Sequence, residues 1–144
     1  MRVLNFCKRI LMTLLLISAI MLNVSCSADN SKNKNAVSIV DSESWFSDFT
    51  VDNDKVYIKC EITLQNTADE KQKVKMAAVC PDDVELGLLK EEKIYAVDEQ
   101  DKVKEFVINS NSGKSFNVVF LGEFAGTAEK SDRLLPEITI ESVE

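Results

Sequence analysis

The chain has 144 residues, with 17 lysine and arginine residues against 24 aspartate and glutamate residues, and it contains no histidine. This acidic balance argues against nucleic acid as a partner and against electrostatic docking on anionic lipid, because both need clusters of basic side chains. The lack of histidine excludes Ser-His-Asp and Cys-His catalytic sites, and most zinc sites, in their usual forms.

The beginning of the chain has the layout of an export signal. Its first nine residues include three basic ones, residues 10–24 are almost wholly apolar, and the apolar run stops at Ser25 and Cys26. The run is shorter than the ~20 residues that a transmembrane helix needs, so we expect a removable signal peptide over residues 1–25. The exported remainder has 14 basic and 24 acidic residues, a net charge of −10.

The end of this leader, Leu22-Asn23-Val24-Ser25-Cys26, resembles the lipobox of bacterial lipoproteins. In that family the leader is cleaved just before the cysteine, which then carries acyl chains. The resemblance implies lipidation at Cys26 and an extracytoplasmic protein anchored in the membrane through that lipid. Asn23 stands where the family usually has an apolar residue. The alternative is an ordinary signal peptidase cleavage after Ala28, which would give a secreted protein.

Residues 26–35 follow the leader and are polar, with no apolar side chain larger than alanine after the cysteine. Such a stretch cannot bury enough surface to offset the entropy of ordering it, so we expect a flexible spacer. Its reach as a random coil would be on the order of 15 to 20 Å. Residues 36–144 are then long enough for one domain with one core.

Period-two alternation dominates residues 36–144. It is clearest in 56–64, where Val56, Ile58, Cys60, Ile62 and Leu64 alternate with polar residues or tyrosine. We expect one or two helical turns in 81–92 and a hairpin about Ala68 that pairs 56–64 with 74–80. The predicted strands, seven in all, are 45–51, 56–64, 74–80, 93–97, 103–108, 115–121 and 137–143.

Seven short strands in about 100 residues indicate an all-β antiparallel sandwich with Greek-key connections. The segments VYIKCEITLQN and EFVINSNSGKSFNVVF also resemble the immunoglobulin-like modules of bacterial surface proteins. The whole chain is similar to small lipoproteins of low-GC Gram-positive bacteria. This resemblance implies a single immunoglobulin-like sandwich over residues 36–144 and no particular activity.

Two cysteines, Cys60 and Cys80, remain in the predicted domain. A pair of cysteines in an exported protein allows a disulfide. In the predicted hairpin, however, Cys60 lies opposite Met76 and Cys80 lies about four residues further along. At ~3.3 Å per residue that offset is too long for a disulfide. We therefore expect buried thiols, with a disulfide as the alternative.

Acidic turns provide the only candidates for ionic chemistry. Asp52 and Asp54 could supply hard oxygen ligands to calcium, although the glycine and bidentate glutamate of an EF-hand loop are absent. Ordinary hairpin turns explain the same residues. Adjacent carboxylates such as Asp82 and Asp83 could in principle serve a glycosidase-like reaction, but turns and short helices are also where solvated charges belong.

The connection Gly122–Pro136 is long for a hairpin in a compact sandwich. It carries Phe124, Arg133, Leu134 and Leu135, a mixture of apolar and arginine side chains that is typical of binding hot spots. We take these four residues as the candidate binding site. The alternative is that Phe124 and the leucines plug one end of the sandwich.

These observations predict a lipid-anchored, non-catalytic binding or scaffolding module of the cell envelope. Its partner would be an unknown protein or cell-wall component, and we expect no cofactor. The alternative is a carboxylate- or calcium-dependent envelope enzyme built on a β-sandwich.

Overall fold

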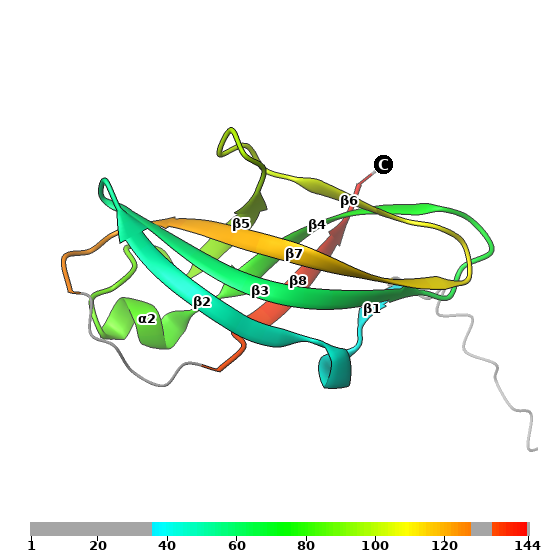
Figure 1. The fold of residues 1–144 in the computed structure, drawn as a ribbon, viewed down its shortest axis with the longest axis horizontal. Helices are drawn as coiled ribbons and strands as arrows, with labels where there is room; N and C mark the ends of the chain where they lie inside the picture. The colour runs from blue at the N-terminus through cyan, green and yellow to red at the C-terminus, as the bar shows by residue number, and fades with distance from the viewer. Residues whose placement is uncertain (1–35, 128–133, 144) are drawn as a thin grey trace, which may run out of the picture. The chain divides into compact units, whose positions relative to one another are not determined.

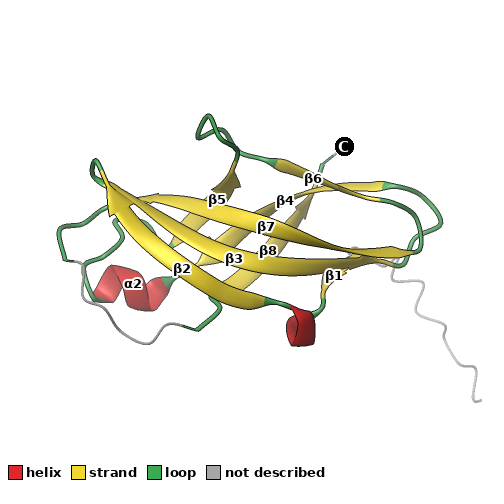
Figure 2. Cartoon of the chain, viewed as in Figure 1, coloured by secondary structure: helices red, strands yellow, loops and turns green. Residues whose placement is uncertain are grey.

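The computed structural model describes residues 36–127 and 134–143, which belong to one compact unit, Lys34–Glu144. Strands dominate this unit, with one short 3-10 helix and one short α-helix (Figure 2). The elements are β1 (Val37–Ile39), η2 (Asp41–Glu43), β2 (Trp45–Asp52), β3 (Lys55–Asn66), β4 (Gln72–Val79), α2 (Pro81–Glu85), β5 (Lys93–Val97), β6 (Glu105–Ile108), β7 (Ser112–Glu123) and β8 (Glu137–Ser142).

The eight strands form one antiparallel sheet that folds over into two layers. In the first layer, β3 pairs with β1 and β2 along one edge and with β7 along the other. In the second layer, β4 lies between β6 and β8. β5 joins the layers because it pairs with both β7 and β4. Figure 1 shows β2, β3 and β7 in front of β4 and β8.

The prediction of an all-β antiparallel sandwich is therefore confirmed, and each of the seven predicted strands is present. β1 was missed, although Val37 and Ile39 alternate with Ser38 and Val37 is buried. The likeness to immunoglobulin-like modules stays a prediction.

The core fills the space between the layers and follows the alternation seen in the sequence. Every second residue of β3 from Val56 to Leu64 is at most 2% exposed. The partners of Ile58 and Cys60 on β7 are Phe120 and Val118, which are equally buried. Each residue of this face is removed from water by the opposite layer, and this burial is the main favourable term for folding.

The predicted hairpin between β3 and β4 is wrong. The two strands do not pair, because β3 is already flanked by β2 and β7 and the chain crosses from one layer to the other after Asn66. The alternation fixed which face of each strand is buried, but it did not identify the neighbouring strand.

Asn66 organises this crossing from a fully buried position. Its Nδ2 donates to the carbonyl oxygens of Glu70 at 2.8 Å and Asn109 at 2.9 Å, and its Oδ1 accepts from the Ala68 N–H at 2.9 Å. These bonds satisfy backbone groups that leave the sheet ladder at the corner, where an unpaired buried group would be costly.

β5 and β6 act as one interrupted partner of β4. Ala77 lies opposite Tyr95 and Lys75 lies opposite Glu105, so residues 96–104 leave the β4 ladder between these two pairs. Within this excursion Val97 bridges Val103, and the Lys104 N–H donates to the Ala96 carbonyl at 2.8 Å. In this segment β5 pairs with β7, and the two layers are joined along this side of the sheet.

Candidate functional site

A groove beside α2 brings together part of the predicted binding segment and a helix that follows β4. The helix starts with Pro81 at its first position, where the missing N–H costs nothing, and it carries Asp82 and Asp83 in the first turn, where negative charge is favoured. It ends at Glu85, and Gly87, which follows the C-cap residue Leu86, has a φ of +75° that favours glycine. The predicted one or two turns of helix are confirmed.

The start of the connection after β7 is held against the segment that follows α2. Phe124 forms a β-bridge with Leu89, and its N–H donates to the Asp54 carbonyl at 2.9 Å. The N–H groups of Ala125 and Thr127 donate to the carbonyls of Leu88 and Gly87 at 2.9 and 3.0 Å. The Phe124 side chain packs against the core. Phe124 thus lies where the plug model puts it.

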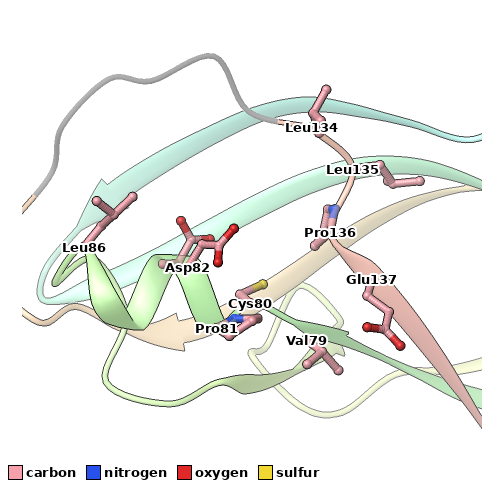
Figure 3. A pocket seen from close by; sticks show the side chains of 10 residues that line it. Val79, Cys80, Pro81, Asp82, Leu86, Leu134, Leu135, Pro136 and Glu137 are labelled. Carbon is pink, nitrogen blue, oxygen red and sulfur yellow. The ribbon is translucent and has the colours of Figure 1, made fainter.

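The end of the same connection forms one wall of the groove, which encloses about 470 Å³. Figure 3 shows Leu134, Leu135 and Pro136 on this wall and Leu86 and Asp82 on the α2 wall. We call this space the α2 groove. It is lined by Val79, Cys80, Pro81, Asp82, Asp83, Leu86, Leu134, Leu135, Pro136 and Glu137.

Two leucines of the α2 groove are strongly exposed. The exposed fraction is 89% for Leu134 and 55% for Leu86, whereas Leu135 packs partly against the core. Among the described residues only four large apolar side chains are exposed, the other two being Trp45 and Val103. Half of them therefore line one groove, on opposite walls, rather than being scattered singly over the surface.

The α2 groove is also acidic. Asp82, Asp83 and Glu137 line it, and neither Asp82 nor Glu137 forms an ion pair with any described residue. Ion pairs between other described residues use exposed lysines such as Lys55 and Lys93. A ligand of this groove would therefore combine an apolar surface with positive charge.

The structure brings together some of the predicted site residues and not others. Leu134 and Leu135 line the α2 groove, and Phe124 anchors the other end of their connection to the core. Arg133 and the proposed lipidation site Cys26 lie outside the described residues. Glu137, which also lines the groove, was not among the predicted site residues.

Leu86 was also missed as a lining residue. Leu89 is buried and Leu86 is not. Gly87, with its positive φ, interrupts the helical backbone between the two leucines, so their three-residue spacing does not place them on one face.

The calcium candidates Asp52 and Asp54 belong to a tight turn, Asp52 just before it and Asp54 within it. Asp52 pairs with Lys55, and the two residues between them, Asn53 and Asp54, have φ of 47° and 61°. This is the backbone of a two-residue type I′ hairpin, which favours Asn and Asp for conformational reasons. Across residues 36–127 and 134–143, no three His, Cys, Asp or Glu side chains are grouped to hold a metal ion.

The two cysteines are buried and are not joined to each other. The prediction of buried thiols is confirmed, although the hairpin register used to reach it was wrong. Burial raises the pKa of the Cys60 thiol to about 12, so this group stays protonated at neutral pH and is a poor nucleophile. Cys80 contributes to the floor of the α2 groove and is 5% exposed.

A second hollow, of about 440 Å³, lies where the loop after β5 meets Tyr57, Lys59 and Val119 of the sheet. Two carboxylates of the loop, those of Asp98 and Asp101, have partners within it or beside it. Asp98 accepts the N–H groups of Gln100 and Lys102 at 2.9 and 3.0 Å, and the Lys102 bond is the larger cause of its lowered pKa. Asp101 pairs with Lys55 at 2.6 Å. These contacts give Asp98 and Asp101 a role in the structure of the loop.

No protein-family model, curated protein or solved structure matches the chain. Within the described part of the chain, no helix has the length and apolar character that crossing a bilayer requires.

Proposed function

We propose that the chain is a lipid-anchored, extracytoplasmic and non-catalytic binding module, and that it binds a protein partner of the cell envelope through the α2 groove. The observation that carries the binding role is that the exposed leucines Leu86 and Leu134 line the same acidic groove. An exposed apolar cluster with a polar rim is typical of protein interaction sites.

The proposed location outside the cytoplasm rests on the signal peptide and on Cys26. If Cys26 is lipidated, the intact mass of the native protein will show acyl chains on a chain that begins at this residue. Cys26→Ser will then release the protein from the membrane fraction. A mature protein that begins at Asp29 would contradict the anchor and support secretion instead.

The binding role can be tested without knowing the partner. A photo-cross-linking residue is placed at Leu134 in cells that naturally produce the chain, and a matched one is placed at Val103, which is 48% exposed and lies away from the groove. We expect a discrete cross-linked product from position 134 and none from position 103. Equal products from both positions, or none from either, would contradict a specific site in the groove.

A further inference from the structure

Several strands of the folded sheet have a free edge, and these edges differ in how well they are protected. β1 and β2 lie along one side of β3, residues 112–118 of β7 pair only with β3, and β6 and β8 each pair with β4 alone among the described strands. An unprotected edge is a template for another strand, so soluble proteins usually block it with bulges, proline or lysine.

The β2 edge is blocked by its own irregularity. The register with β3 shifts between Phe46 and Asp48, which leaves Ser47 as an extra residue. Such a bulge bends the strand and interrupts its pattern of donors and acceptors. A straight incoming strand therefore cannot pair along the whole of β2.

The β8 edge has none of these devices. Its six residues pair with β4 in unbroken register from Glu137 opposite Val79 to Ser142 opposite Val74. The segment EITIES contains no proline and no lysine. The free edge of β6 is also regular, but β6 has only four residues, and the free part of β7 carries Lys114.

The register shows which backbone groups this edge offers. The Val143 N–H donates to the Lys73 carbonyl at 2.9 Å, so it points toward β4. Because N–H direction alternates along a strand, the N–H groups of Ile138, Ile140 and Ser142 point away from β4. These three residues present donors and acceptors at the spacing that an antiparallel strand requires.

The side chains of β8 define the chemistry of that strand. Ile138 and Ile140 face the core and are only partly buried, so apolar residues of an added strand would cover them. The opposite face carries Glu137 and Glu141. Glu141 is already paired with Lys93 at 2.6 Å, whereas Glu137 forms no ion pair with the described residues. Basic residues on the outer face of the incoming strand would complement this charge.

A second copy of the chain fits this edge poorly. Antiparallel pairing of β8 with itself would bring Glu137 and Glu141 of one copy near those of the other, and like charges across a strand pair are destabilising. The net charge of −10 on the exported chain adds to this repulsion.

We propose that an extended segment of a partner protein, alternating basic and apolar residues, adds to β8 as an antiparallel strand. This inference rests on the proposed function and names its mode of recognition. Glu137 is both the first residue of β8 and part of the α2 groove, so the added strand leads directly to Leu134 and Leu86. Backbone bonds along β8 would supply affinity, and the leucines would supply specificity.

The probe for this proposal is the blocked peptide Lys-Val-Lys-Val-Lys-Val-Lys-Val, added to the full chain in detergent. We expect the peptide to slow hydrogen exchange at the N–H groups of Ile138, Ile140 and Ser142. The same peptide with N-methyl valines lacks the donors that face β8 in the antiparallel arrangement. It should bind at least about tenfold more weakly, a difference of ~1.4 kcal/mol.

A protein variant gives an independent measurement. Ser142→Pro removes one outward N–H at an exposed position without removing a bond to β4, and Ser142→Ala is the matched control that keeps the N–H. We expect the proline variant to lose binding about tenfold or more while the alanine variant binds normally. The N-methyl comparison decides the matter even if Ser142→Pro folds poorly.

Equal binding of the two peptides, or protection confined to other strands, would overturn strand addition. The proposed function is tested separately, by the cross-link from position 134. If position 134 yields a specific cross-link that Ser142→Pro leaves unchanged, the groove binds a partner without using the β8 edge. In that case only the strand-addition proposal falls.

Discussion

The two ends of the connection between β7 and β8 carry similar apolar residues in opposite environments. Phe124, at one end, is held by a backbone bond to Asp54 and packs against the core. Leu134, at the other end, is 89% exposed. Apolar character alone therefore does not locate a binding surface. The backbone bonds of the neighbouring residues separate the structural end from the exposed end.

The largest effect should come from the anchored end. Phe124→Ala removes a partly buried ring and should lower the free energy of unfolding by about 2 to 3 kcal/mol, less than for a fully buried phenylalanine. Urea unfolding curves measure this loss. Leu134→Ala is the matched change at the other end and should stay within about 0.5 kcal/mol of the original protein. Equal losses for the two variants would contradict the comparison.

A smaller effect is expected at Gly122, where β7 runs into the anchored end. A Cβ at this position would lie 2.6 Å from Leu89 Cδ2 and 2.9 Å from Ile94 Cγ2, and both of those side chains are buried. Gly122→Val should therefore cost about 1 to 3 kcal/mol through overpacking. Thermal unfolding measures it, and a variant as stable as the original would show that this end is loosely packed.

The pH dependence of stability tests whether the core keeps the Cys60 thiol buried and protonated. The pKa of Cys60 rises from 9.0 to about 12 on burial, so above about pH 9 the unfolded chain loses a proton that the folded chain keeps. Stability should then fall by up to ~1.4 kcal/mol per pH unit between about pH 9 and 12.

Cys60→Val is the control for this titration, because lysine and tyrosine titrate equally in both proteins and cancel in the difference. The loss attributable to Cys60 is present in the original protein and absent in the variant. Identical slopes for the two proteins in urea unfolding across this range would contradict a buried, protonated thiol.

Local patterns in the sequence predicted the faces and positions of the strands well. The alternation from Val56 to Leu64 gave the buried face of β3, and Lys93–Val97 has the predicted bounds. The type I′ turn at Asn53 and Asp54 follows from residues that tolerate positive φ. These features depend on neighbouring residues, and so the sequence carries them directly.

Strand partners and the candidate site could not be predicted in the same way, because both depend on residues far apart in the chain. Asn66 holds its corner through the carbonyl of Asn109, and the excursion at 96–104 depends on a match with β7. Leu86 and Leu134 line the same groove only because the fold places α2 beside the start of β8. Alternation along one strand contains no information about such arrangements.

The most direct test of the binding role measures stability and capture on one variant. Leu134→Ser should leave the unfolding curve unchanged within about 0.5 kcal/mol, since the side chain is already in water. The same variant should lose the cross-link formed from a probe at Leu86, on the opposite wall of the groove. A variant that is unchanged in stability but still forms the cross-link in full would contradict the α2 groove as the binding site.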